Sequence, residues 1–157
     1  MHLELFKLID RIVALDLAAK TVVVEAVVPK TNTIFEGHFP GRPLMPGVLL
    51  IEAMAQASGW LLIAAMDFKR MPFLAAVKDA KMRRFIEPGE TLEITARITH
   101  EGSGFAMTEA EIRSAGKMTT SAAITFSHVP FPNAEFRKHM LEEAERIGLP
   151  QPAGAHD

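Results

Sequence analysis

The chain has no cysteine and no tyrosine among its 157 residues, and it has a single tryptophan. Without cysteine it can form neither a disulfide bond nor a thiolate metal site, and it has no cysteine nucleophile. An excess of charge is also lacking: the formal net charge is −2, which gives no general attraction to nucleic acid or to acidic membranes. The N-terminal residues mix both charge signs and contain no uninterrupted apolar run, so we expect no secretion signal and a cytoplasmic location.

One stretch, residues 35–65, has a composition unlike the rest of the chain: FEGHFPGRPLMPGVLLIEAMAQASGWLLIAA. It starts as a loop rich in glycine and proline that contains His38. It continues as roughly five turns of almost wholly apolar helix, with Glu52 as its one carboxylate. Pro46 suits the first helical position, because its missing N–H would have no intrahelical partner there.

The start of this helix offers a site for negative charge. The backbone N–H groups of Gly47 and Val48 have no intrahelical acceptor and carry the positive end of the helix dipole. They therefore favour an oxygen that gains negative charge. Gly47 has no side chain, which lets a ligand approach the backbone closely.

Helical periodicity places five residues of this stretch along one stripe: Val48, Glu52, Gln56, Gly59 and Ile63. The other faces are apolar apart from one serine, and a helix that is apolar nearly all round is buried. A buried carboxylate is costly unless it is paired or protonated, so Glu52 is a candidate for chemistry.

Two other interpretations of the helix remain open. Residues 43–66 have the length of a membrane span, but Pro46, Gly47 and the two polar residues of the stripe oppose it. Alternatively, Glu52 and Gln56 only hydrogen-bond to nearby backbone in a core helix, since structural networks also bury carboxylates.

The flanking segments predict an antiparallel sheet, with a short helix at residues 3–9 before it. Strand-like runs are separated by Pro-Gly and Gly-rich turns, and they cover residues 11–15, 21–28, 73–77, 92–99, 105–114 and 118–127. The sum is an α+β fold in which an antiparallel β-sheet wraps around one long central apolar helix.

We expect one domain over residues 1–129. Residues 130–157 form a C-terminal extension, with a helix at about 133–147 capped by Asn133 and stopped by Gly148, then a disordered tail after Pro150.

The motif GHFPGRPLMPGVLLIEAMAQASG closely resembles the signature of the 3-hydroxyacyl-[acyl-carrier-protein] dehydratases of the FabZ type. The similarity extends less tightly over residues 8–127. It implies a hotdog fold and removal of water from a (3R)-3-hydroxyacyl thioester to give the trans-2-enoyl product. It assigns His38 as the base, Glu52 as the acid or orienting group, and the N–H of Gly47, with Val48 beside it, as the donor to the thioester oxygen.

The resemblance also implies the remaining parts of the site. Gln56 is expected to orient Glu52. Met45, Val48, Ala53 and Phe85 are candidates for the acyl tunnel, although ordinary core packing is the favoured explanation for each. The two catalytic residues of one site come from different subunits of a homodimer in this family, and three dimers often form a hexamer. No cofactor is expected, because the elimination needs none.

The substrate arrives on an acidic acyl carrier protein, and a basic run could attract it. The run contains Lys69, Arg70, Lys78, Lys81, Arg83 and Arg84; the alternative is a solvated strand face. The other histidines have no ligand-like spacing, so we predict no metal site. Nucleic acid is not expected, because the run lacks interleaved aromatic residues.

Three features depart from the family pattern: a shortened N-terminus, MHLELFKL, the absence of tyrosine, and the helix after residue 130. They suggest a paralogue for unusual or very long acyl chains, such as those of lipid A. The rival functions are a hotdog acyl thioesterase, which hydrolyses the thioester, and a non-catalytic hotdog module that only holds acyl chains.

Overall fold

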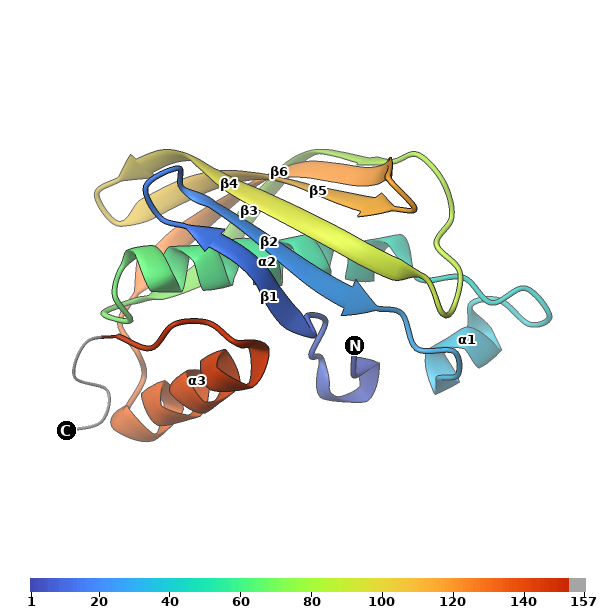
Figure 1. Cartoon of the computed structure of the whole chain (residues 1–157), viewed down its shortest axis with the longest axis horizontal. Helices are drawn as coiled ribbons and strands as arrows, with labels where there is room; N and C mark the ends of the chain where they lie inside the picture. The colour runs from blue at the N-terminus through green and yellow to red at the C-terminus, as the bar shows by residue number, and fades with distance from the viewer. Residues whose placement is uncertain (153–157) are drawn as a thin grey trace.

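In the computed structural model, which describes residues 1–152, a curved antiparallel sheet wraps around one long helix (Figure 1). The strand order is β1-β2-β4-β5-β6-β3. The strands are β1 (Arg11–Asp16), β2 (Thr21–Val27), β3 (Met71–Met82), β4 (Thr91–Gly102), β5 (Phe105–Ser114) and β6 (Lys117–Val129). The helices are α1 (Thr33–Gly37), α2 (Gly47–Ala65) and α3 (Ala134–Ile147), and a 3-10 turn covers Leu3–Leu5. This is the hotdog arrangement that the sequence predicts.

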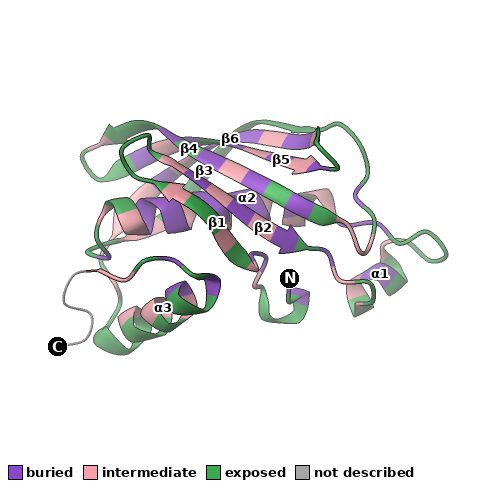
Figure 2. Ribbon diagram, viewed as in Figure 1, coloured by how far each residue is buried: buried purple, intermediate pink, exposed green. Residues whose placement is uncertain are grey.

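Helix α2 lies on the concave face of the sheet (Figure 1), and many of its residues are buried (Figure 2). Leu50, Met54 and Leu61 are each at most 2% exposed and face the strands. Full burial of one such side chain stabilises the fold by about 1.5–3 kcal/mol. A buried polar pair between the helix and the sheet is satisfied, because the hydroxyl of Thr108 donates to that of Ser58 at 2.9 Å.

Helix α2 is long and apolar enough to cross a membrane, but 56% of its most apolar window is buried inside the protein. The core helix of a soluble fold passes the same test of length and composition. The burial by strands on one side favours the core-helix interpretation over a membrane span.

Three local expectations differ from the structure. Residues 3–9 form only a 3-10 turn, with Leu5 63% exposed while Leu8 is fully buried. Pro46 is the N-cap and not the first helical residue, because its ψ of 131° is extended. Helix α1, which the sequence analysis missed, begins after Asn32, whose side chain accepts a hydrogen bond from the N–H of Ile34.

Strand β3 is longer than the predicted run at residues 73–77, since it continues through the basic residues to Met82. It forms one edge of the sheet, and β1 forms the other. Edge strands tolerate charged side chains well, because one side of the strand faces water. A prediction from the pattern of apolar residues therefore ends this strand too early, at the first run of charged residues.

Helix α3 lies on the side of α2 opposite the sheet (Figure 1). It occupies residues 134–147, with Asn133 accepting from the N–H of Phe136 at 2.7 Å and Gly148 in the left-handed conformation after its end. Ala144 and Ile147 are buried on its inner face. The predicted disorder after Pro150 falls mainly on residues 153–157, which lie outside the described residues.

Candidate active site

The loop before α2 holds His38 in one orientation. The N–H of Leu44 donates to the carbonyl of His38 at 2.9 Å, and Nδ1 of His38 lies 2.9 Å from the carbonyl oxygen of Leu44. A carbonyl can only accept, so Nδ1 carries the hydrogen and Nε2 is left as an acceptor. The ring also stacks on Phe39, with centroids 4.2 Å apart. The result is an imidazole whose free nitrogen can take a proton.

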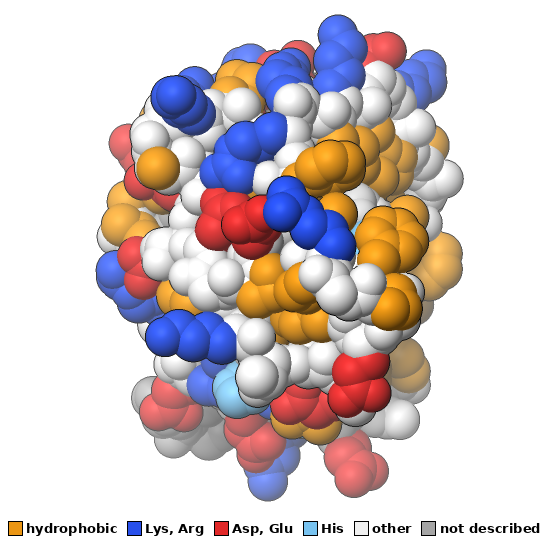
Figure 3. All heavy atoms as spheres, turned by 90° about the vertical axis from the view of Figure 1, so that its right-hand side faces the viewer, with side chains coloured by type: hydrophobic (Ala, Val, Ile, Leu, Met, Phe, Trp, Pro, Cys, Tyr) orange, Lys and Arg blue, Asp and Glu red, His pale blue; other side chains and the backbone are white. Residues whose placement is uncertain are grey.

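The start of α2 lies close to this loop along the chain. The structure records no acceptor, among the described residues, for the N–H groups of Gly47 and Val48. A Cβ at Gly47 would lie 3.4 Å from the Cε atom of Met82, so the backbone is closely approached there. Figure 3 shows this end of the molecule, where apolar patches lie among Lys and Arg side chains. The free N–H groups and the His38 loop thus lie at the same end of α2.

Glu52 lies about 7.5 Å further along the helix axis, on its least buried stripe. Nε2 of Gln56 donates to Oε1 of Glu52 at 3.1 Å and also to the carbonyl of Phe6 at 2.9 Å. Oε1 of Gln56 accepts from the N–H of Leu8 at 3.0 Å. This network fixes which end of the Gln56 amide faces Glu52, and among the described residues it leaves Oε2 of Glu52 without a hydrogen-bond partner.

Glu52 lines a cavity of about 370 Å³ between α2, the N-terminal segment and α3. His38 is not among the residues that line this cavity. The structure records no hydrogen bond between the two side chains within the chain. Within one chain, the two candidate catalytic groups therefore share neither a hydrogen bond nor this cavity.

The residues suggested for the acyl tunnel lie elsewhere. Met45 and Ala53 are at most 4% exposed and belong to the core, while Phe85 and Val48 are 71% and 72% exposed. None of them lines the cavity beside Glu52. Met45 and Ala53 belong to the core cluster, and their role in an acyl tunnel stays a prediction. Gly59 and Ile63, which helical periodicity places on the stripe of Glu52, do line the cavity, whereas Ala55 is a lining residue that the sequence analysis missed.

The six basic residues do not form one patch in the monomer. Lys69 and Arg70 precede β3, whereas Arg83 and Arg84 follow it, and an extended strand of this length spans roughly 40 Å. Lys78 and Lys81 are exposed along the strand between them. Any carrier surface at the His38 end of α2 would therefore draw on the second half of this set.

The charge of Arg84 is already paired. Its guanidinium donates to both carboxylate oxygens of Glu90, at 3.0 and 2.7 Å, and the hydroxyl of Ser114 donates to the same carboxylate at 2.6 Å. The hydrogen bonds from Arg84 lower the pKa of Glu90 to about 2, against the opposing effect of its burial. This network anchors the loop between β3 and β4.

A pH dependence of stability follows from the Glu90 network. Because the pKa of Glu90 is depressed in the folded state, its contribution is present above its ordinary value of about 4.5 and is lost as the pH falls towards about 2. Glu90→Gln is expected to lower the free energy of unfolding by about 1.5–3 kcal/mol at pH 7. Urea titrations should show this difference shrinking as the pH is lowered below 4. Glu36→Gln, at an exposed carboxylate, is the control, and a Glu90→Gln deficit independent of pH would contradict the assignment.

Among residues 1–152 there is no group of three or more His, Cys, Asp or Glu side chains that could hold a metal ion.

Comparisons with known proteins agree with this architecture. A family model described as the FabA-like domain matches residues 1–123. The chain is 31% identical over 131 residues to a 3-hydroxyacyl-[acyl-carrier-protein] dehydratase FabZ of Chlamydia pneumoniae, covering 82% of this chain and 86% of the relative. It is 34% identical over 108 residues to the dehydratase of the same name from Lactiplantibacillus plantarum, covering 68% of this chain and 74% of the relative.

Solved structures support the fold alone, because their identities to this chain are low. A conserved protein of Pseudomonas aeruginosa, PA5202, superposes with a TM-score of 0.62 at 23% identity, over 80% of this chain and 91% of that one. A mutant of the thioesterase PA1618 of the same organism also superposes with a TM-score of 0.62 at 16% identity, over 81% of this chain and 84% of that one. With the family model covering most of the chain and several relatives above 30% identity, this chain belongs to the FabA-like family and is a dehydratase of the FabZ type.

Proposed function

We propose that this enzyme removes water from (3R)-3-hydroxyacyl-[acyl-carrier-protein] thioesters, giving trans-2-enoyl thioesters in fatty-acid synthesis. The hydrogen bond from Nδ1 of His38 to the carbonyl of Leu44 is the observation that carries the mechanism. It leaves Nε2 as an acceptor at the end of α2 where two backbone N–H groups are free. A base and an oxyanion site are the two elements that removal of a proton next to a thioester carbonyl requires.

In this mechanism Nε2 of His38 takes the proton from C2 of the substrate. The negative charge that develops on the thioester oxygen is stabilised by the N–H of Gly47, and one such donor contributes about 3 kcal/mol. The bond between C3 and the hydroxyl oxygen then breaks, and Glu52 supplies a proton so that the group leaves as water. Exchange with solvent returns the proton from His38 and reprotonates Glu52. Gln56 holds the carboxyl group towards C3 through its contact with Oε1.

A homodimer with shared sites completes this mechanism. His38 lies outside the cavity lined by Glu52, so the facing histidine comes from the second copy. The surface that favours this assembly is the β3 edge, where ten of the twelve residues are exposed. Its exposed apolar side chains include Phe73, Leu74, Val77 and Met82. Unpaired backbone groups beside apolar side chains are a template for pairing with another strand.

The partner that delivers the substrate is an acidic acyl carrier protein. Lys78, Lys81 and Arg83 are exposed near the site end of β3. Arg83 donates to the hydroxyl of Ser121 and has no acidic partner among residues 1–152. These three charges are the part of the predicted basic set that we assign to carrier docking. The C-terminal extension further favours unusual or very long acyl chains, such as those of lipid A, and a cytoplasmic setting fits a carrier-dependent enzyme.

One assay tests the proposed reaction against its rivals. A synthetic (3R)-3-hydroxyacyl carrier incubated with the enzyme is expected to gain the ultraviolet absorbance of an enoyl thioester, with no signal from a thiol-reactive dye. Release of free thiol without the absorbance change would identify a thioesterase instead. Binding of the carrier with neither signal would identify a non-catalytic module. Lipid A use is tested in the same assay with substrates of increasing chain length.

A further inference from the structure

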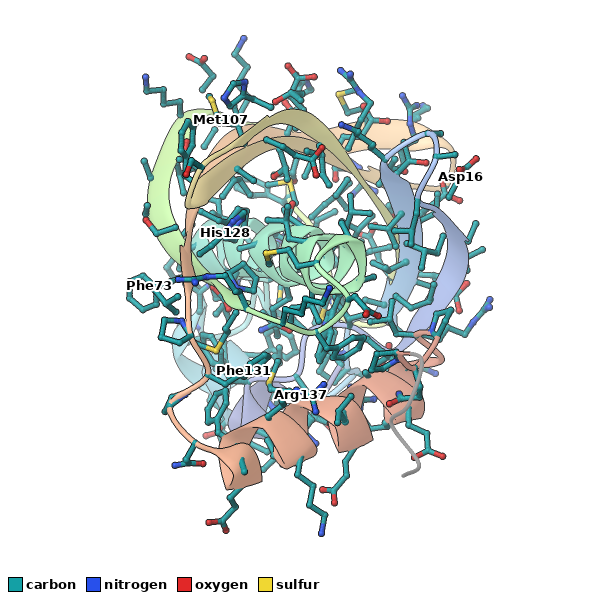
Figure 4. All side chains as sticks on the ribbon, turned by 90° about the vertical axis from the view of Figure 1, so that its left-hand side faces the viewer. Asp16, Phe73, Met107, His128, Phe131 and Arg137 are labelled. Atoms are coloured by element: carbon teal, nitrogen blue, oxygen red, sulfur yellow. The ribbon has the colours of Figure 1, made fainter. Side chains whose placement is uncertain are left out.

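Helix α3 is fixed against the body of the protein by contacts at both ends. Near its start, Nε of Arg137 donates to the carbonyl of Phe68, just after α2, at 3.2 Å. Figure 4 shows Arg137 and Phe131 on the inner side of α3, below the sheet and α2. Near its end, the guanidinium of Arg146 donates to the carbonyl of Ile9 at 3.0 Å. The helix therefore has a defined position on the face of α2 that the sheet leaves uncovered.

An ion-pair network reinforces the second of these attachments. Glu143 of α3 accepts from Lys7 at 2.9 Å and pairs with Arg146 at 2.6 Å. Burial acts to raise the pKa of Glu143, but the hydrogen bonds from Arg146 and Lys7 outweigh it, so its pKa lies below the ordinary value. Glu143 is thus ionised at neutral pH and neutralised by its two cations. The charges on this wall of the cavity are paired with one another.

The cavity between α2 and α3 is a continuation of the candidate site. On α2 it is lined at successive turns by Glu52, Ala55, Gly59 and Ile63. From Glu52 to Ile63 the helix rises about 16 Å. Half of a bilayer's hydrocarbon core, which is the depth of one membrane-lipid acyl chain, is about 15 Å. The groove therefore runs away from the proposed acid for the length of an acyl tail.

The facing wall of this groove is supplied by α3. Phe136 and Met140 line it, with Met140 half-buried and packed against the core and the ring of Phe136 6.3 Å from that of Phe131. The volume of about 370 Å³ falls within the ~300–1,000 Å³ of small-molecule pockets. Helix α3 begins at Ala134, after the last residue matched by the family model. This wall is thus built by a segment outside the matched region.

We propose that α3 is a specificity element of this enzyme: its inner face covers the distal carbons of the substrate's acyl tail in the groove that leads from Glu52. This inference rests on the proposed dehydration. Without Phe136 and Met140 the tail beyond the first turns would lie against water. Each methylene that the wall covers adds binding energy in the transition state as well as in the ground state. The kcat/KM for substrates with long acyl chains should therefore depend on α3, and that for substrates with short acyl chains should not.

The test is dehydration of a series of (3R)-3-hydroxyacyl carriers with acyl chains from about four to about sixteen carbons. A series is informative because full burial of a methylene group raises kcat/KM by up to about fourfold. Met140→Glu introduces a charge into the groove. It is expected to lower kcat/KM at least about tenfold for the longest chains and less than about twofold for the shortest. Ala134→Glu adds the same charge at an exposed position of α3 and should leave the whole series unchanged.

Four outcomes decide the inference. Loss confined to long chains supports it, and a Met140→Glu profile parallel to that of the wild type overturns it. If Met140→Glu loses every substrate alike, Met140→Ser, a milder change, must still lose long chains selectively. If the wild type dehydrates nothing, the proposed function fails. Binding of dansyl-labelled undecanoic acid then tests separately whether the groove holds an acyl chain. Weaker binding by Met140→Glu but not by Ala134→Glu then supports an acyl groove. Equal binding by Met140→Glu and the wild type would overturn the acyl groove, and a change only in oligomeric mass would assign the groove to a second copy of the chain.

Discussion

Replacing His38 by alanine is expected to lower kcat for dehydration by about 10²-fold or more, because no other group can take the C2 proton. His38→Asn is the sharper variant. Its amide can keep a hydrogen bond to the carbonyl of Leu44, as Nδ1 does at 2.9 Å, yet it offers no basic nitrogen at the position of Nε2. Both variants should therefore lose activity equally, which would separate proton removal from positioning of the loop.

The partner carboxyl should show a comparable loss. Glu52→Gln keeps the shape of the side chain and its contact with Gln56 but removes the acidic proton. We therefore expect a loss of about 10²-fold or more in kcat. His100→Ala, at an exposed histidine stacked on Phe105, is the control and should retain full activity. The measurement is the initial rate of absorbance gain with one carrier substrate. Rates near those of the wild type in His38→Asn or Glu52→Gln would remove the assigned roles.

Charging the β3 edge is expected to dissociate the enzyme and abolish its activity. Phe73 is 61% exposed and points away from the protein (Figure 4), and Val77 is 37% exposed on the same strand. In the double variant Phe73→Asp with Val77→Asp, two like charges would face their copies across a two-fold axis. Light scattering should then report the mass of one chain, 17.3 kDa. Activity should fall by about 10²-fold or more, since each site would lack one of its two groups.

The opposite edge of the sheet provides the matched control. Val13 in β1 is 48% exposed, and Val13→Asp should leave both mass and rate unchanged. A monomeric variant that remains active would show that one chain supplies the whole site.

Mixing the two point variants separates shared from unshared sites. Exchange of subunits between His38→Ala and Glu52→Gln should restore about a quarter of the wild-type rate, because a mixed dimer then contains one intact site and one doubly defective site. If each chain used its own pair, every site in the mixture would carry one defect and no activity would return.

Particular elements show how far sequence reasoning reached. The central helix was placed to within one residue at its N-terminus, because proline and glycine mark its start and an all-round apolar pattern marks its burial. The hairpin at β4 and β5 was found from Gly102 and Gly104. The contact between Gln56 and Glu52 was expected from their spacing of one helical turn. Each of these rests on interactions between residues close in sequence.

The misses have a common cause in contacts between distant segments. The bond of Gln56 to the carbonyl of Phe6 joins residues fifty apart, and nothing in the local pattern indicates it. The basic residues were grouped by their closeness in sequence, but β3 is extended and separates its two ends. The role of Arg84 as the partner of Glu90 likewise depends on how a loop closes.

By itself, the sequence determined the kind of fold, the family and the two chemical groups on which the proposal depends. Local spacing and a long motif are sufficient for that, because helix starts, turns and periodic burial are properties of short segments. Only the tertiary structure decided that Nδ1 of His38 is taken by Leu44, that Glu52 opens into a groove walled by α3, and that His38 of the same chain does not line this groove. These features depend on which distant surfaces pack together and which edge stays uncovered, and no window of sequence contains that information.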